Sequence, residues 1–312
     1  MRTTVRSLDK APAVRAAVAS RIDPGDRLTF FAADLTSDAG WDEAAAGCVY
    51  VLHVASPLGT QRPKVPDDLI VPARDGALRA LRAAAKAGVR RVVLTSSVSA
   101  SSPQGSASDG TSDETVWTPP ARGLAHAYGQ SKMLAERAAW DFVAATPGAP
   151  ELATVLPSLV LGPVLTPDNL GSVQVVSRLL AGRVPGIPRI GFMLVDVRDV
   201  ADLHLRAMTM PEAAGERWIA AGEWKWMAEI AALLRERLGA GAAKVPTRKV
   251  PDVVLRLVAL FDPALRLVAP GLGRRRAFTA AKAQRLLGWT PRPVTETIVE
   301  CAESLIATGA IG

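Results

Sequence analysis

Short apolar runs alternate with helical patterns along the first two-thirds of the chain. Strand-like runs occupy residues 3–6, 28–33, 49–54, 91–96 and 153–160, and helical patterns lie between them at 11–20, 42–46, 69–87 and 128–145. Strands that alternate with helices form parallel sheets, because each helix carries the chain back to the start of the next strand. The sequence therefore predicts an α/β protein built on a doubly wound parallel sheet.

The pattern is looser after Gly162 and Pro163. Two strands are predicted at 193–197 and 217–220, and helices at 199–209, 226–238, 251–260 and 279–287. The run at 49–54 is apolar enough for a buried strand. The segment 99–120 is rich in Ser, Gly and Pro, so we expect a loop there that borders a functional site.

Length and composition exclude several classes of protein. The 312 residues suit two domains or one large α/β unit, and 49% hydrophobic residues exclude a disordered chain. Proline interrupts the longest apolar run, residues 152–167, so we expect no membrane span and no membrane partner. The first residues lack an apolar signal core, which favours the cytoplasm. Cys48 and Cys301 are too far apart in sequence to suggest a zinc site or a disulfide framework.

The net charge of +7 would suit a nucleic-acid-binding protein. The basic residues are, however, scattered through amphipathic segments, and the dense cluster is confined to Arg274, Arg275 and Arg276. A nucleic-acid footprint needs cations gathered on one face. We therefore expect a solvated basic surface and no nucleic-acid partner.

Tyr128 and Lys132 carry the clearest chemical signal, together with the serines that follow the predicted strand at 91–96. Tyr and Lys four positions apart lie on one face of a helix. An ammonium beside a phenol lowers the tyrosine pKa, so the phenol can exchange a proton with a substrate oxygen near neutral pH. The Ser97 hydroxyl can hold the same oxygen. A Tyr-x-x-x-Lys pair alone is a weak signal, and the serines at the strand end strengthen it.

Further motifs occur in order along nearly the whole chain. They are Thr4-Val5-Arg6 with Lys10, Asp34-Leu35, His53-Val54-Ala55-Ser56-Pro57, Thr95-Ser96-Ser97, Pro157-Ser158-Leu159-Val160-Leu161-Gly162-Pro163, Val197-Arg198-Asp199-Val200-Ala201-Asp202 and Leu287-Gly288-Trp289-Thr290-Pro291. With these motifs the chain resembles the extended short-chain dehydrogenases/reductases. The similarity is to the dihydroflavonol-4-reductase-like and bacterial aldehyde/carbonyl reductase branch of the NAD-dependent epimerase/dehydratases. The ordered set is specific, although no single motif is.

The resemblance implies a Rossmann-type sheet with a smaller C-terminal substrate domain. It implies an NADP-binding domain at residues 1–162, to which 190–222 return, and a substrate domain at 163–189 and 223–312. It also implies that Ser97, Tyr128 and Lys132 are catalytic. Tyr128 would donate a proton to a carbonyl oxygen while NADPH delivers hydride to the carbon, and Lys132 would lower the tyrosine pKa and bind the ribose hydroxyls.

The resemblance further implies a set of cofactor contacts from the adenine to the nicotinamide end. These are Asp34, Leu35, Val54, Ala55, Ser56, Lys132, Tyr128, Pro157, Val160 and Ser172. Arg6 and Lys10 lie where the family places cations on the 2′-phosphate. An acidic residue is expected at this place in NAD enzymes, so Arg6 indicates NADP.

The sequence departs from the family at its N-terminal end, where the first βα unit with its Gly-x-x-Gly-x-x-Gly turn is absent. The Gly pairs 239/241 and 271/273 follow helical patterns and predict helix ends and turns. The absent strand is central in the order 3-2-1-4-5-6, so we expect two unpaired sheet edges, low stability and weak NADP binding. We also expect about 30 upstream residues, the size of one βα unit.

Several other residues are expected to be structural. They are His53, His126, His204, Trp218, Trp224 and Trp226, and the three histidines are too scattered for a metal site. Asp199 and Asp202 predict a helix N-cap followed by an acidic third residue.

The leading hypothesis is an NADP-dependent reductase of an aldehyde or ketone, monomeric or homodimeric, with a small-molecule carbonyl substrate. A nucleotide-sugar epimerase or dehydratase is an alternative, because it uses the same Ser, Tyr and Lys. The motifs at 53–57 and 157–163 favour the reductase branch. The other alternative is an inactive or NADP-sensing homologue, which the absent phosphate loop favours and the intact catalytic set opposes.

Overall fold

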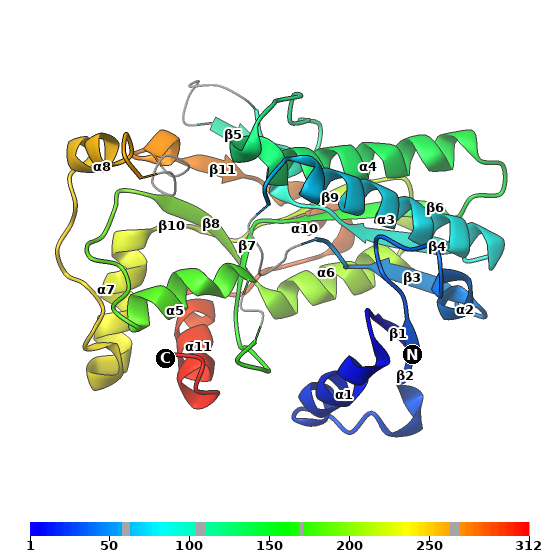
Figure 1. Cartoon of the computed structure of the whole chain (residues 1–312), viewed down its shortest axis with the longest axis horizontal. Coiled ribbons are helices and arrows are strands. Elements are labelled where there is room, and N and C mark those ends of the chain that lie inside the picture. The colour runs from blue at the N-terminus through cyan, green and yellow to red at the C-terminus, as the bar shows by residue number, and fades with distance from the viewer. Residues whose placement is uncertain (58–62, 104–109, 169–170, 263–268, 312) are drawn as a thin grey trace.

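A parallel sheet of four strands forms the centre of the molecule. The computed structural model describes residues 1–57, 63–103, 110–168, 171–262 and 269–311. The sheet has the order β3-β4-β6-β9, from β3 (Tyr50–His53), β4 (Arg91–Thr95), β6 (Glu151–Pro157) and β9 (Arg217–Ala220). Figure 1 shows helices on both sides of these strands. The predicted α/β class is thus confirmed.

The inner strands are buried on both faces, as their apolar sequences require. Successive side chains of β4 point to opposite faces, so Val92 and Leu94 join one apolar cluster and Val93 another. The edge strand β3 differs from the prediction of a buried strand at 49–54. Leu52 is 40% exposed and Val54 59% exposed, and β3 is an edge strand that pairs with β4 alone.

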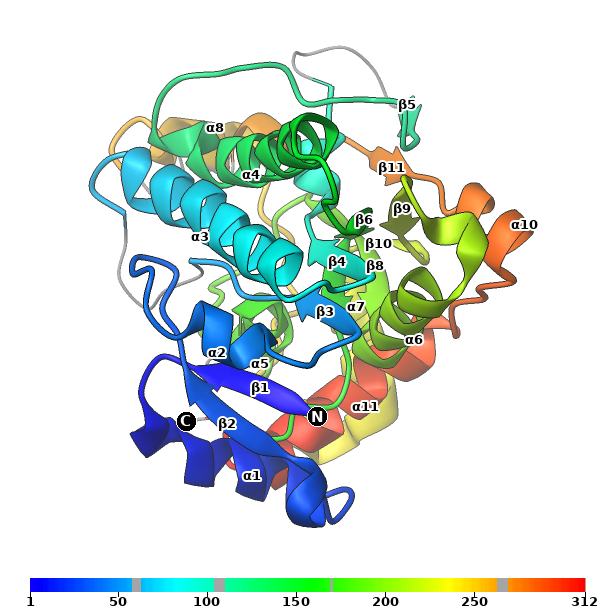
Figure 2. The same cartoon turned by 90° about the vertical axis from the view of Figure 1, so that its right-hand side faces the viewer.

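Helices cover the two faces of the sheet. On one face α3 (Asp67–Lys86) and α4 (Ala127–Ala145) lie side by side, and on the other lie α6 (Val197–Thr209) and α10 (Ala281–Leu287). Figure 2 shows α3 and α4 above the strands and α6 below them. Small buried side chains at the first interface, Ala77 of α3 and Ala139 of α4 among them, allow close packing of helices on the sheet.

The N-terminal residues form a separate unit. Here β1 (Arg2–Val5) pairs in parallel with β2 (Thr29–Ala32), and α1 (Ala11–Ala19) and α2 (Trp41–Ala45) accompany them. Neither strand joins the four-stranded sheet. No strand among the described residues pairs with the second edge of β1 or of β3, which agrees with the two unpaired edges expected from the sequence.

The C-terminal half adds two small sheets and a second apolar core. One sheet contains β7 (Leu159–Leu161), β8 (Gly191–Asp196) and β10 (Trp224–Trp226), and the other pairs β5 (Gly110–Ser112) with β11 (Arg276–Phe278). The remaining α-helices of the described residues are α5 (Gln174–Leu180), α7 (Met227–Leu238), α8 (Asp252–Val258) and α11 (Val294–Ala307). Leu179, Leu234 and Ile298 link α5, α7 and α11 in one buried cluster. Among the residues placed in the structure, no helix is long and apolar enough to cross a membrane.

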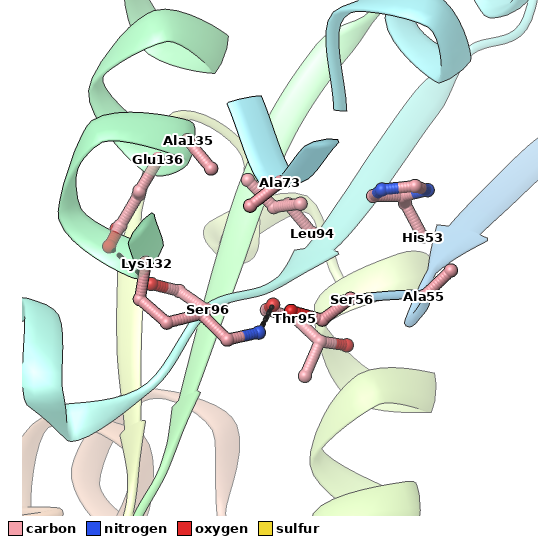
Figure 3. A pocket seen from close by; sticks show the side chains of 10 residues that line it. All are labelled: His53, Ala55, Ser56, Ala73, Leu94, Thr95, Ser96, Lys132, Ala135 and Glu136. Atoms are coloured by element: carbon pink, nitrogen blue, oxygen red, sulfur yellow. Dashed lines mark hydrogen bonds between the residues drawn. The ribbon is translucent and has the colours of Figure 1, made fainter. Parts of the chain in front are cut away.

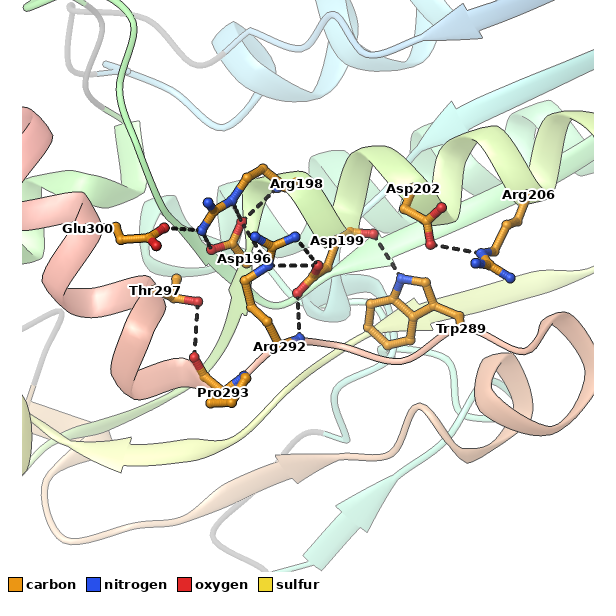
Figure 4. Close-up of polar contacts among 10 residues, drawn as sticks. All are labelled: Asp196, Arg198, Asp199, Asp202, Arg206, Trp289, Arg292, Pro293, Thr297 and Glu300. Carbon is orange, nitrogen blue, oxygen red and sulfur yellow. Dashed lines mark hydrogen bonds and ion pairs between the residues drawn. The ribbon is translucent and has the colours of Figure 1, made fainter.

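An ionic network fastens α6 to α11 (Figure 4). The carboxylate of Asp196, which is 1% exposed, accepts the backbone N–H of Arg198 at 2.8 Å and pairs with the Arg198 guanidinium at 2.8 Å. The same guanidinium also binds Glu300 of α11. Asp196 is therefore the N-cap of α6 and neutralises a cation shared by two helices.

The prediction that Asp199 caps this helix is wrong. Asp199 is the third residue of α6, and its carboxylate accepts the backbone N–H of Arg292 at 2.8 Å and its Nε–H at 2.9 Å. The Asp199 carbonyl accepts the indole N–H of Trp289 at 2.8 Å. The acid at this position thus ties down the distant segment 289–292, a contact that local sequence does not reveal.

Two other sequence predictions need correction. The strand predicted at 153–160 is two strands, β6 and β7, which separate at Ser158 and join different sheets. The loop predicted at 99–120 contains β5, which pairs with a strand more than 160 residues later in the chain. Residues 104–109 of this segment lie outside the described residues.

Candidate active site

The candidate site is built around one face of α4 at the carboxyl end of β4. Tyr128, Lys132 and Glu136 follow one another at intervals of four residues, so a helix places them on the same side. His126 is the N-cap residue of this helix, as expected for its entry. Opposite them, β4 ends at Thr95 and the chain continues through Ser96 and Ser97 in extended conformation.

The Ser97 hydroxyl lies close enough to the Tyr128 phenol to lower its pKa. The Ser97 Oγ accepts the backbone N–H of Ser99 at 3.1 Å, which holds the serine in place. Burial of the phenol raises the pKa of Tyr128, and Ser97 opposes this only in part. Tyr128 is therefore protonated at neutral pH, and because it is 38% exposed its hydroxyl group is open to a ligand.

Lys132 is held at the end of β4. Its Nζ donates to the carbonyl oxygen of Thr95 at 3.3 Å, and burial lowers the pKa of Lys132 to about 8 despite the nearby Glu136 carboxylate. That Lys132 lowers the pKa of Tyr128 stays a prediction. In this structure burial is the largest influence on the Tyr128 pKa.

Glu136 is a site residue that sequence reasoning missed. It is 0% exposed, and its carboxylate accepts hydrogen bonds from Ser96 Oγ at 2.6 Å, Thr154 Oγ1 at 2.8 Å and Arg217 Nε at 2.8 Å. The Arg217 guanidinium also lies over the Trp117 ring, 3.7 Å from its centroid. A buried carboxylate with a paired cation and full hydrogen bonding fixes α4 against β4, β6 and β9. The sequence feature that could have indicated Glu136 is its position four residues after Lys132 on the same helix.

The carboxyl ends of β3 and β4 enclose a small cavity beside Lys132 (Figure 3). His53, Ala55, Ser56 and Thr95 line it together with Lys132, and its volume of about 10 Å³ holds one water at most. Burial, and secondarily the Lys132 charge, lower the pKa of His53 to about 4, so this histidine is neutral. The structure therefore brings the predicted residues Ala55, Ser56 and Lys132 together.

A second histidine supports the same strand end from the other face of the sheet. Thr95 Oγ1 lies 2.7 Å from His204 Nε2, and His204 Nδ1 lies 2.8 Å from the carbonyl oxygen of Val200. A carbonyl only accepts, so Nδ1 carries the hydrogen and Nε2 accepts the hydroxyl hydrogen of Thr95. The neutral ring agrees with the lowering of the His204 pKa by burial. Thr95 is thus held through its hydroxyl while its carbonyl holds Lys132.

The residues expected at the adenine end meet at the carboxyl ends of β1 and β2. Val5 lies opposite Ala32 in the pair, so Arg6 and Asp34 are near neighbours. Hydrogen bonds from Thr36 lower the pKa of Asp34, and the charge of Arg6 adds to this. Val54 and Lys10 are exposed, whereas Leu35 packs against Gly76 of α3 so closely that a Cβ there would lie 2.4 Å from it.

The residues expected at the nicotinamide end lie where β6 and β7 separate. Pro157 ends β6, Val160 belongs to β7, and the Ser172 hydroxyl donates to the carbonyl oxygen of Val160. The neighbouring Ser158 hydroxyl is buried and has no hydrogen-bond partner among the described residues. A buried polar group usually has a partner, so this hydroxyl fits a polar group of a bound ligand.

The remaining expected contact, a glycine-rich phosphate turn, is not found among the residues that the structure describes. Gly239 ends α7, and Gly273 lies in a turn with φ of 73°, as the sequence predicted for both. The chain therefore provides polar groups for the two ends of a dinucleotide, while its diphosphate has no such cradle next to β1, β3 or β4 in the described ranges.

Comparisons with known proteins place this geometry in a family. Residues 2–221 match the NAD dependent epimerase/dehydratase family. The chain is 37% identical to cinnamoyl-CoA reductase 1 of Oryza sativa subsp. japonica over 214 residues, which are 68% of this chain and 61% of that protein. It is 34% identical to tetraketide alpha-pyrone reductase 1 of Arabidopsis thaliana over 290 residues, or 91% of this chain and 81% of that protein.

The fold is also similar to that of a solved reductase. The crystal structure of the yeast methylglyoxal/isovaleraldehyde reductase Gre2 complexed with NADPH has a TM-score of 0.78 and 26% sequence identity. The similarity covers 99% of this chain and 92% of that chain. Family match, sequence identity and fold agree with the resemblance expected from the motifs, and the chain belongs to the NAD dependent epimerase/dehydratase family.

Proposed function

We propose that the protein is an NADPH-dependent reductase that acts on the carbonyl group of an aldehyde or ketone. The observation that carries the proposal is the protonated, partly exposed Tyr128 beside Ser97, with Lys132 on the same helix face. The relatives named above are reductases, and the yeast structure contains NADPH. Both facts support the same class of reaction.

The chain's own residues bind the carbonyl oxygen and supply its proton. The NADPH, when bound, supplies the hydride. Ser97 and Tyr128 hold the carbonyl oxygen between their hydroxyl groups, and Tyr128 donates its proton to that oxygen as negative charge develops there. The phenolate that remains is stabilised by the ammonium of Lys132. The bonds of Glu136 and Thr95 keep α4 and the lysine in position for this role.

The cofactor contacts are assigned on the same basis. Arg6 and Lys10 bind the 2′-phosphate, Asp34 and Leu35 the adenine, and Ser158 donates its unpartnered hydroxyl at the nicotinamide end. The Rossmann part at 1–162 with 190–222, and the substrate part at 163–189 with 223–312, are proposed as two functional domains.

The decisive test replaces one of the two tyrosines at a time. Tyr128→Phe removes the proton donor, so kcat/KM for reduction of an aldehyde falls by about 10²- to 10⁴-fold. Tyr50→Phe is the matched control, because Tyr50 lies in β3 and its hydroxyl accepts a hydrogen bond from Arg90 at 3.5 Å, away from the catalytic face of α4. Turnover is measured as NADPH oxidation with a panel of aldehydes and ketones, and binding as NADPH fluorescence.

Three outcomes contradict the proposal. Equal turnover of Tyr128→Phe and the parent would remove the assigned mechanism. Conversion of a nucleotide sugar without net consumption of NADPH would make the protein an epimerase or dehydratase. Binding of NADPH with no reduction of any carbonyl compound would instead favour an NADP-sensing protein.

A further inference from the structure

The exposed apolar side chains of this protein are concentrated on α8 and the turn that follows it. Val253 is 66% exposed, Leu257 57% and Phe261 87%, and Val254 and Val258 are also exposed. These five residues form the α8 face. No residue of α8 is buried, whereas α7 and α11 each bury one side in the apolar core. Apolar residues gathered on an exposed surface mark an interaction site more often than scattered ones do.

Helical spacing makes the α8 face continuous. Val253 and Leu257 are four residues apart, as are Val254 and Val258, and Phe261 follows in the same direction one turn later. The buried Ala259, at 5% exposure, marks the side toward the protein. Figure 1 shows α8 at the outer edge of the C-terminal half, far from the N-terminal strands.

Positive charge is concentrated in the part of the sequence that contains this helix. Residues 244–276 contain eight Lys and Arg against two Asp, a net charge of +6 out of +7 for the whole chain. Arg248, Lys249 and Arg256 are exposed beside or within the helix. The carboxylate of Asp252 is paired with Arg189 at 2.7 Å, so it leaves the surrounding surface positive.

A hollow of about 640 Å³ adjoins the α8 face at Val253. Its walls include Trp226 and Pro251, and its charged residues are the cations Arg189 and Lys249 and the anions Glu229 and Asp252. The hollow has none of the catalytic residues in its lining, and its volume is in the range that accommodates a small molecule or a lipid chain. Apolar surface, an aromatic ring and charged side chains of both signs thus meet in one region outside the candidate active site.

We propose that the α8 face binds the surface of an anionic lipid bilayer, with its apolar side chains among the lipid headgroups and acyl chain ends. Helices that combine exposed apolar residues with neighbouring Lys and Arg lie in such interfaces, where anionic headgroups attract the cations. A second copy of the chain suits the face less well, because a two-fold contact would bring like charges together. A nucleic acid would leave the apolar residues without a partner.

The test measures co-sedimentation of the full chain with lipid vesicles. We expect binding to vesicles of phosphatidylcholine with phosphatidylglycerol and little binding to phosphatidylcholine alone. Leu257→Glu and Phe261→Glu each weaken binding at least tenfold, by the approximate value of one buried large apolar side chain. Arg256→Glu weakens it about fivefold or more, and raising the ionic strength weakens the parent's binding.

Leu205→Glu is the matched control, because Leu205 is a 52% exposed leucine on α6. This control retains parental binding, and all variants retain the parent's unfolding temperature and NADPH oxidation. Equal binding to neutral and anionic vesicles would overturn the proposal, as would an equal loss in Leu205→Glu or no binding at all. A concentration-dependent dimer that Leu257→Glu abolishes, without vesicle binding, would assign the face to a second copy.

Discussion

The N-terminal pair of strands and the four-stranded sheet have the same kind of parallel pairing but very different burial. All four residues of β9 and six of the seven in β6 are buried, whereas β1, β2 and α1 contain no buried residue. The sheet has helices on both faces and paired inner strands, while the N-terminal pair has one hydrogen-bonded edge per strand. Parallel pairing alone is therefore not what buries these strands, because the edge strand β9 is buried with one neighbour; the covering helices bury them.

The contacts of β1, β2 and α1 are peripheral, whereas α2 buries Trp41 and Ala45 against α3. Arg2 lies over the Phe31 ring at 3.9 Å and donates to the carbonyl oxygen of Glu43 at 2.6 Å, and Arg15 lies over Phe30 at 5.5 Å. Exposed cation–π pairs stabilise by about 0.5–1 kcal/mol each. The catalytic residues thus stand on the well-buried sheet, and the residues proposed for the adenine end stand on a unit of low local stability. We expect this unit to open before the sheet unfolds.

The largest effect expected on stability is in the sheet. Trp218 of β9 is 0% exposed within the cluster that joins β4, β6 and α6, so Trp218→Ala lowers the free energy of unfolding by about 3–5 kcal/mol. Urea unfolding followed by circular dichroism measures the change. The half-buried Trp226 of β10 is the control, and Trp226→Ala costs less. A loss below about 1 kcal/mol for Trp218→Ala would mean that the buried sheet is not the stable region.

The next largest effect is a dependence of stability on pH, which arises from His53 of the four-stranded sheet. Burial lowers the pKa of His53 to about 4 from an ordinary value of 6.5, so between these pH values the unfolded state binds a proton that the folded state does not. Stability is then lost as the pH falls from 6.5 to 4, by about 3 kcal/mol in total. His53→Asn removes this dependence. The measurement compares the free energies of unfolding at pH 7 and pH 5. If the parent and the variant lost the same free energy between these pH values, His53 would not be buried as a neutral ring.

Much of the sheet and the catalytic face was predictable, because both depend on local patterns. The alternation of strands and helices predicted β4, β6, β9, α3 and α4 within a few residues. The spacing of Tyr128 and Lys132 predicted that they share one face of a helix. The serines after β4 were predicted to lie beside that face. These inferences succeed because helical and strand periodicity are set by residues near in sequence.

The rest depends on contacts between distant residues. Arg217 reaches Glu136 across 81 positions and His204 reaches Thr95 across 109, and no spacing rule predicts either contact. The strands β5, β10 and β11 have three residues each, which is too short to show the two-residue alternation of apolar and polar side chains. The direction of the Tyr128 pKa also depended on burial, which the motif does not specify. The low burial of β1 and β2 likewise depends on which strands and helices pack against them, and their own apolar sequences do not specify this.

A smaller effect tests the proposed function of the N-terminal unit. Arg6→Ala removes a cation proposed to bind the 2′-phosphate, so the Kd for NADPH rises about tenfold, or about 1.4 kcal/mol, while the Kd for NADH stays unchanged. Arg21→Ala is the control, because Arg21 is exposed after α1 and is assigned no cofactor contact. Fluorescence titration measures both constants. Equal loss of NADPH and NADH affinity would show that Arg6 acts through the fold of the unit and does not recognise the phosphate.

The smallest effect is expected inside α1. Val14 is 37% exposed, and helix α1 has no buried residue, so Val14→Ala changes the global free energy of unfolding by less than about 0.5 kcal/mol. Hydrogen exchange adds the sharper observation, because the amides of α1 and β1 exchange well before those of β4 and β6 in the same molecule. If Val14→Ala instead cost as much as a core substitution, the N-terminal unit would unfold together with the sheet. The unit would then be stabilised by interactions other than burial of apolar side chains. The two regions would differ in how exposed their side chains are but not in stability.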